Sequence, residues 1–158
     1  MFNKKLILIW AAFLAIVIAG CNDEEPIKEE VIQHNWNESP LFKSGSYTMI
    51  GEEGRLGFIY DDSEVDRFYP NKTQKYMWHF WGNEAELIGD FMVLGTHENS
   101  DEEITIVPKS GNSFLSPNNG ADHHLPTNMT LPKSGMWKLD AYIGDEIFGS
   151  VYVKVHEK

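Results

Sequence analysis

The side chains best suited to metal chemistry in this sequence are three consecutive residues, Asp122, His123 and His124. Imidazole nitrogens and carboxylate oxygens are donors that zinc and copper accept. Consecutive residues of an extended chain point in opposite directions, so only one of the two histidines can share an ion with Asp122. A complete metal site would therefore need a further histidine from elsewhere, such as His79 or His97.

A structural role explains the same three residues. They lie in a segment rich in Pro, Asn and Gly, 117–126, where Asp and His side chains hydrogen-bond to the backbone of turns. We favour this interpretation and predict no cofactor and no metal. Metal binding through Asp122, His123 and His124 is kept as the alternative.

A second group of acidic side chains, Asp62, Glu64 and Asp66, stands at alternate positions and raises the question of calcium. Arg67 occupies the place where an EF-hand loop needs its glycine, and no bidentate glutamate follows at the required distance. The pattern therefore favours a solvent-exposed acidic loop.

Motifs of the common enzyme classes are missing from this sequence. It contains no G-x-S-x-G, H-E-x-x-H, P-loop or G-x-G-x-x-G pattern, and no nucleophile and base can be paired from spacing. A glycan-binding platform would need Trp78 and Trp81 on the same face of the sheet. Alternation along a strand places them on opposite faces, so we expect no such platform. We predict that the protein is not an enzyme.

The single cysteine, Cys21, follows a segment typical of secretion signals. Lys4 and Lys5 precede an apolar run of 13 residues, 6–18, and two small residues then lead to the cysteine. The run is shorter than the roughly 20 residues of a transmembrane helix and fits a signal peptide. Residues 18–21 resemble the bacterial lipobox. The resemblance implies that Cys21 carries a lipid anchor at the extracytoplasmic face of the cell membrane.

The residues after Cys21 change in composition. We predict a signal peptide over 1–20, a lipidated cysteine and acidic flexible tether over 21–40, and one domain over 41–158. The formal net charge of the chain is -11, and removal of Lys4 and Lys5 with the signal peptide makes it more negative. Such a chain repels phosphate backbones, so nucleic acid is excluded as a partner, and membrane association has to come from the anchor.

The segments that must position these side chains have the alternation of β-strands. The predicted strands include 46–50, 55–60, 75–81, 90–97, 103–107, 136–143 and 146–155. Both faces of 75–81 are apolar or aromatic, which indicates a central strand. In 136–143 the inward residues are predicted to be Trp137, Leu139, Ala141 and Ile143. Across a two-residue turn, Gly144-Asp145, the predicted inward residues of 146–155 are Ile147, Gly149, Val151, Val153 and Val155.

These segments predict an all-β, antiparallel, immunoglobulin-like β-sandwich of about seven or eight strands. The stretch NMTLPKSGMWKLDAY, 128–142, resembles the corner between strands E and F of immunoglobulin-like domains, with Trp137 in the place of a corner or core aromatic. The disulfide of antibody domains is absent, because the chain has one cysteine. The resemblance is therefore to the wider immunoglobulin-like class.

Three blocks behind the lipobox, 75–82, 117–126 and 131–155, resemble a family of uncharacterised lipoproteins of Gram-positive spore-formers with an immunoglobulin-like domain. The resemblance implies a fold and a location and no activity. We predict a membrane-anchored surface lipoprotein whose domain is a non-catalytic binding module. Its expected partner is an envelope protein or a cell-wall component, and a metal-binding envelope domain is the alternative.

Overall fold

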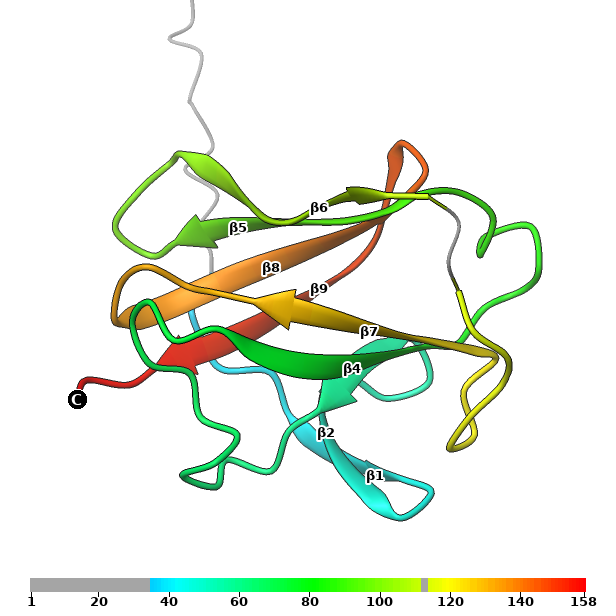
Figure 1. Cartoon of the computed structure of the whole chain (residues 1–158), viewed down its shortest axis with the longest axis horizontal. Helices are drawn as coiled ribbons and strands as arrows, with labels where there is room; N and C mark the ends of the chain where they lie inside the picture. The colour runs from blue at the N-terminus through cyan, green and yellow to red at the C-terminus, as the bar shows by residue number, and fades with distance from the viewer. Residues whose placement is uncertain (1–34, 112–113) are drawn as a thin grey trace, which may run out of the picture. The chain divides into compact units, whose positions relative to one another are not determined.

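Nine β-strands follow one another along the described part of the chain, residues 35–111 and 114–158 of a computed structural model (Figure 1). Their bounds are β1 Leu41–Ser44, β2 Tyr47–Glu52, β3 Leu56–Ile59, β4 Gln74–Phe80, β5 Phe91–His97, β6 Glu103–Ser110, β7 His123–Met129, β8 Gly135–Ile143 and β9 Glu146–Val155. Within these residues no helix has the length and apolar character needed to cross a membrane. Cys21, the predicted signal peptide and most of the predicted tether lie outside the described residues.

The strands form two sheets, and within each sheet all neighbouring strands are antiparallel. One sheet has five strands in the order β1-β2-β3-β4-β7, and the other has four in the order β6-β5-β8-β9. The core lies between the sheets, which confirms the predicted all-β antiparallel sandwich. The strand count exceeds the expected seven or eight because β1, which pairs with β2, has no clear alternation in the sequence.

Aromatic side chains of β4 form the centre of the core. Tyr76, Trp78 and Phe80 are buried and point toward the four-stranded sheet. Across the interface, Phe91 of β5 contacts Trp78 at 5.6 Å and Phe80 at 5.3 Å between ring centroids. β4 lies between β3 and β7, as the aromatic residues on both of its faces predict. Edge-to-face aromatic pairs of this kind add stability beyond the area that they bury.

The predicted inward face of β8 is confirmed, because Trp137, Leu139, Ala141 and Ile143 are all buried. The opposite face holds one unexpected residue, Asp140, which is also buried. Its carboxylate accepts hydrogen bonds from the Lys138 ammonium at 2.9 Å and from the Ser150 hydroxyl of β9. A buried carboxylate needs such partners, because an uncompensated charge in the protein interior is strongly unfavourable.

The predicted inward face of β9 is confirmed at Val151, Val153 and Val155 and is wrong at the start of the strand. Ile147 is exposed, whereas Phe148 is buried. The pairing explains the difference: Ala141 is opposite Gly149, but the next residue of β8, Tyr142, is opposite Ile147. The β-bulge skips Phe148 and reverses which residues of 146–148 face the core.

The segment 117–126, which the sequence predicts to be a loop, contains a tight hairpin and the start of β7. Asn119 and Gly120 both have positive φ, at 48° and 83°, as a type I′ turn requires. Asn118 and Ala121 exchange backbone hydrogen bonds across this turn. His123 and His124 therefore lie at the first two positions of a strand, and the prediction of a loop is wrong there.

Candidate functional site

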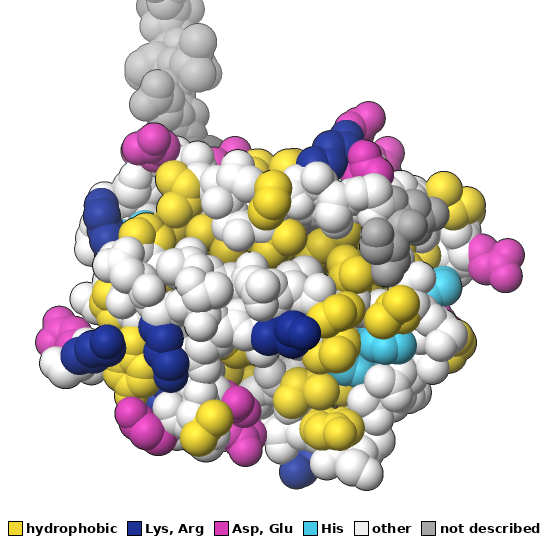
Figure 2. Space-filling model, in the orientation of Figure 1, with side chains coloured by type: hydrophobic (Ala, Val, Ile, Leu, Met, Phe, Trp, Pro, Cys, Tyr) yellow, Lys and Arg dark blue, Asp and Glu magenta, His cyan; other side chains and the backbone are white. Residues whose placement is uncertain are grey.

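The predicted histidine cluster is divided between two faces of β7. His79 of β4 is directly opposite His124 in the strand register, and their rings lie nearly parallel with centroids 6.0 Å apart. His123 points to the other face, where its ring lies 6.0 Å from that of Phe114. Histidine side chains are visible over the start of β7, bordered by hydrophobic side chains (Figure 2). The structure thus brings His79 to His124 and separates His123 from both.

His79 is fully buried on the outer face of the five-stranded sheet. Its Nδ1 lies 3.1 Å from the carbonyl oxygen of Met77, and its Nε2 lies 3.2 Å from Nδ2 of Asn119. The carbonyl accepts and the amide nitrogen donates, so both contacts are satisfied by the neutral imidazole with its proton on Nδ1. Burial lowers the pKa of His79, and the nearby His124 acts in the same direction.

The three consecutive residues 122–124 hydrogen-bond to backbone groups. His123 Nδ1 lies 2.9 Å from the carbonyl oxygen of Leu115, and His124 Nδ1 lies 2.6 Å from that of Ser116. The carboxylate of Asp122 accepts a hydrogen bond from the amide of Gly82 at 2.9 Å. Residues 35–111 and 114–158 contain no group of three or more His, Cys, Asp or Glu side chains placed to hold a metal ion.

His97, the other histidine considered for this cluster, lies in the four-stranded sheet. Its Nε2 is 2.9 Å from the carbonyl oxygen of Ser134, and its Nδ1 accepts a hydrogen bond from the amide of Asn99. Its ring contacts Trp137 at 5.1 Å between centroids. His97 therefore supports the packing of Trp137 and does not approach His124.

The acidic segment 61–66 is organised by basic and phenolic side chains. Asp62 accepts hydrogen bonds from Arg67 Nε at 3.0 Å and from the hydroxyl of Tyr60 at 3.2 Å. The hydrogen bond from Arg67 lowers the pKa of Asp62. Glu64 accepts a hydrogen bond from the hydroxyl of Tyr69. These contacts hold the loop against the domain.

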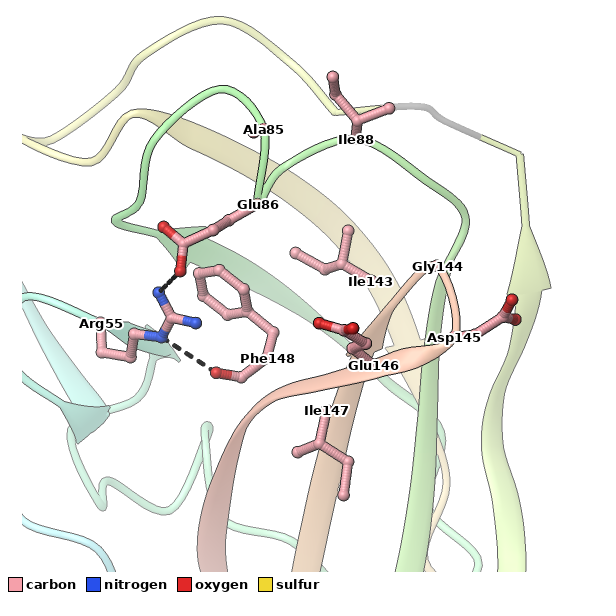
Figure 3. A pocket seen from close by; sticks show the side chains of 10 residues that line it. All are labelled: Arg55, Ala85, Glu86, Ile88, Ile143, Gly144, Asp145, Glu146, Ile147 and Phe148. Carbon is pink, nitrogen blue, oxygen red and sulfur yellow. Dashed lines mark hydrogen bonds and ion pairs between the residues drawn. The ribbon is translucent and has the colours of Figure 1, made fainter.

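A pocket of about 410 Å³ lies beside the turn between β8 and β9, away from the histidines. Its walls combine aliphatic, aromatic and acidic side chains with a single basic one (Figure 3). The lining residues are Arg55, Ala85, Glu86, Ile88, Ile143, Gly144, Asp145, Glu146, Ile147 and Phe148. We refer to it as the β8–β9 pocket.

Arg55 is held firmly in the wall of this pocket. Its guanidinium carbon lies 3.6 Å from the centroid of the Phe148 ring, a cation–π contact. Its Nε donates a hydrogen bond to the carbonyl oxygen of Phe148, and one terminal nitrogen donates to Glu86, both at 3.0 Å (Figure 3). The positive charge of Arg55 is therefore shared between an acidic and an aromatic partner.

The loop 82–90 forms the second wall and is fixed at both ends. At one end, Asn83 and Glu86 form mutual hydrogen bonds that close a tight turn. At the other end, the amide of Gly144 donates to the carbonyl oxygen of Asp90 at 2.9 Å. Gly89 has a φ of 142°, and a Cβ there would lie 2.6 Å from the backbone nitrogen of Gly144. Glycine at position 89 is thus required for this close approach.

Two large aliphatic side chains at the edge of the pocket are exposed, Ile88 at 68% and Ile147 at 52%. Ile143 and Phe148 are buried and close the inner side. Glu146 makes no side-chain hydrogen bond or ion pair to any described residue, whereas Asp145 lies 3.4 Å from the ammonium of Lys109. The site therefore offers exposed apolar surface beside carboxylates that are only partly neutralised.

The sequence does not identify this pocket in advance. Arg55 and Glu86 are 31 residues apart, and no spacing rule connects them. Alternation predicts Ile147 to be part of the core, and the bulge that exposes it has no signature in residues 146–149. The sequence does predict the Gly144-Asp145 turn: φ is 66° at Gly144 and not positive at Asp145, as in a type II′ turn.

Comparison with known proteins gives one family and one solved structure. The family described as "Domain of unknown function (DUF4871)" matches residues 27–153. A crystal structure described as a "Putative Lipoprotein from Bacillus anthracis" matches with a TM-score of 0.60 and 20% sequence identity, covering 78% of this chain and 88% of that one. The likeness to that structure shows a shared fold. No curated protein matches this chain.

Proposed function

This chain belongs to the DUF4871 family, whose function is unknown, and we propose that it is a lipid-anchored, non-catalytic binding module of the cell envelope. The observation that carries the binding role is the β8–β9 pocket, where Ile88 and Ile147 expose apolar side chains at a fixed wall. Exposed apolar surface around a hollow is typical of sites that receive a partner.

The proposed anchor is the lipid on Cys21. The lipobox-like residues 18–21 support it, as does the likeness to the Bacillus anthracis structure, whose description includes the word lipoprotein. The proposed location is the extracytoplasmic face of the membrane, with an envelope protein or cell-wall component as the partner. Two acyl chains are enough for stable anchoring, whereas one chain is marginal.

We assign the sandwich to the immunoglobulin-like class on the evidence of its predicted corner. The indole nitrogen of Trp137 donates a hydrogen bond to the carbonyl oxygen of Lys133, four residues upstream, at 2.9 Å. This contact closes the turn before β8 around a buried aromatic ring, and the resemblance places a corner or core aromatic at Trp137. We also propose that the chain is one of the lipoproteins of Gram-positive spore-formers that it resembles.

The test of the binding role is capture of partners by the acylated protein in intact envelopes, followed by cross-linking. The pocket variant is Ile88→Ser/Ile147→Ser, which removes the exposed apolar groups. The matched control is Val65→Ser, because Val65 is 75% exposed and lies in the acidic loop 61–66 outside the pocket.

We expect a component to be captured by the wild type and the control and to be lost with the pocket variant. Capture that is equal for all three proteins would show that the pocket is not the binding surface. If the wild type captures no more material than a sample without the protein, the binding role itself is contradicted.

A further inference from the structure

The charges around the β8–β9 pocket restrict the class of its partner. Among the lining residues there is one basic side chain, Arg55, and it is already engaged by Glu86 and Phe148. Three carboxylates line the same hollow: Glu86 pairs with Arg55, Asp145 lies 3.4 Å from the ammonium of Lys109, and the Glu146 side chain has no hydrogen bond or ion pair among the described residues. The site therefore has a surplus of negative charge.

The apolar part of the site lies directly beside these carboxylates. Ile147 and Glu146 are consecutive residues at the start of β9, and Ile88 lies on the opposing loop wall. Ile147 projects from the other side of the strand from Phe148, at the edge of the pocket (Figure 3). In the same view Ile88 and Ile147 point away from each other with Glu146 between them, so an extended ligand that spans both isoleucines passes the Glu146 carboxylate (Figure 3).

We propose that the β8–β9 pocket binds a short segment of a partner protein in which basic and aliphatic residues alternate. This inference rests on the proposed binding role and adds the chemistry of the partner. Lysine or arginine would face Glu146 and Asp145, and the aliphatic side chains would cover Ile88 and Ile147. The match of charge and apolar surface gives the site its specificity.

Charge argues against two other occupants of the pocket. A second copy of this chain carries the same net charge of -11 and would bring its own acidic rim to the contact. An anionic membrane surface would be repelled by Glu146 and Asp145 in the same way. A basic and aliphatic peptide is attracted by the features that repel these two surfaces.

The test uses the full acylated chain in a non-ionic detergent and three fluorescent peptides of equal length. The first alternates Lys and Leu, the second Glu and Leu, and the third Lys and Ser. Binding is measured by fluorescence anisotropy, with empty micelles as the background. We expect saturable binding of the Lys/Leu peptide only, weakened by raising the salt concentration, since screening reduces the attraction of exposed charges.

Two charge variants distinguish the pocket from the general acidity of the protein. Asp145→Asn/Glu146→Gln removes two of the three acidic charges at the pocket and leaves the Glu86–Arg55 pair in place. Asp101→Asn/Glu102→Gln removes the same two types of exposed residue in the turn between β5 and β6, at the opposite end of the sheet. We expect the pocket pair to weaken binding of the Lys/Leu peptide by at least about fivefold and the control pair by less than about twofold.

Equal weakening by the two pairs would overturn the inference, because binding would then follow net charge. Equal binding of the Glu/Leu or Lys/Ser peptide would overturn it as well, since apolar surface or charge alone would suffice. Binding of no peptide, together with envelope capture that depends on Ile88 and Ile147, would reject this ligand class and leave the proposed function standing. If no peptide binds and envelope capture does not depend on Ile88 and Ile147, both this ligand class and the proposed binding role of the pocket are rejected.

Discussion

At the scale of single residues, three histidines of this protein hydrogen-bond to backbone or side-chain groups of the sheet and its hairpin. His79 is buried between the carbonyl of Met77 and the amide of Asn119, and its neutral form satisfies both. His123 and His124 each place Nδ1 at a backbone carbonyl. The side chains most suggestive of metal chemistry in the sequence thus serve to fix the hairpin at Asn119-Gly120 to the sheet.

The first prediction concerns the pH dependence of stability. Because burial lowers the pKa of His79, the native state holds it neutral, whereas the unfolded chain takes up a proton near the ordinary value of 6.5. The contribution of His79 to stability is complete above pH 6.5 and is lost as the pH falls from there through the lowered pKa. Chemical unfolding between pH 7.5 and 5 should therefore show a steeper loss for the wild type than for His79→Gln.

The matched control for this measurement is His123→Gln, which removes an imidazole from a less buried position of the neighbouring strand. It measures how much the loss of an imidazole and its hydrogen bond at this edge of the sheet changes the pH profile by itself. Parallel profiles for all three proteins would show that His79 takes up a proton as readily in the native state as in the unfolded chain.

The second prediction concerns metal. We expect zinc and copper to leave the melting temperature of the wild type unchanged in chelator-stripped buffer. A native-state ligand at about 100 times its dissociation constant would instead stabilise the fold by roughly 2.7 kcal/mol. A metal-dependent rise in the wild type that is absent from His123→Gln/His124→Gln would contradict this prediction and establish the metal-binding alternative.

At the scale of elements, irregular pairing between β8 and β9 builds the pocket. The bulge between Ala141 and Tyr142 turns Phe148 inward and Ile147 outward. Phe148 then becomes the surface against which Arg55 packs, and Ile147 becomes the exposed edge. Bulges redirect side chains in many sheets, and this bulge redirects Ile147 and Phe148 at the β8–β9 pocket.

The third prediction tests the direction of these two side chains. Phe148→Ala should destabilise the domain by about 3–5 kcal/mol, because it removes a buried ring and the cation–π partner of Arg55. Ile147→Ala should change stability by less than about 0.5 kcal/mol, because its side chain is exposed. Urea unfolding of both variants measures the difference, and the reverse order would mean that the bulge is absent in solution.

The fourth prediction concerns β8. From alternation alone, Lys138→Ala is expected to be near neutral and Trp137→Ala to cost about 3–5 kcal/mol. The structure changes the first expectation, since removal of the Lys138 ammonium leaves the buried Asp140 carboxylate with Ser150 as its remaining partner. We now expect Lys138→Ala to cost about 1–3 kcal/mol.

A double-mutant cycle gives the control for this expectation. In an Asp140→Asn background the buried charge is gone, so Lys138→Ala should cost less than in the wild type. Equal costs in the two backgrounds would show that the stem of the lysine, and not its charge, contributes to stability.

At the scale of the whole molecule, the domain is acidic and its proposed link to the membrane is covalent. The formal net charge of -11 repels anionic lipid and nucleic acid, so the proposed attachment depends on the lipid that we propose on Cys21. The segment before β1 contacts β9, where Tyr152 and Ser39 exchange two hydrogen bonds, and the ring of Trp36 lies 6.0 Å from that of Tyr152. The domain therefore extends to residues on the N-terminal side of Leu41.

The fifth prediction tests the anchor. We expect the mature protein to begin at Cys21, to carry diacylglycerol on its sulfur, and to partition into the detergent phase. Cys21→Ala should leave an uncleaved or a shed form without lipid. Intact-mass spectrometry distinguishes these species, and a mature protein that begins elsewhere with a free thiol would disprove the anchor.

Several properties of this protein follow from sequence alone, because they depend on local patterns. Alternation along 136–143 correctly assigns the buried face of β8, and aromatic residues on both faces of 75–81 place β4 inside its sheet. The Asn119-Gly120 pair is a strong signal for a type I′ turn, so the hairpin before β7 was within reach of a local argument.

Only the tertiary structure determines the pocket and the state of the buried polar groups. The register shift that exposes Ile147 arises from pairing with β8, and the contact of Arg55 with Glu86 joins residues from distant parts of the chain. The burial of His79 depends likewise on a distant residue, Asn119. A period-2 pattern assigns faces only while pairing is regular, and side chains from separate strands meet only after the sheets have formed.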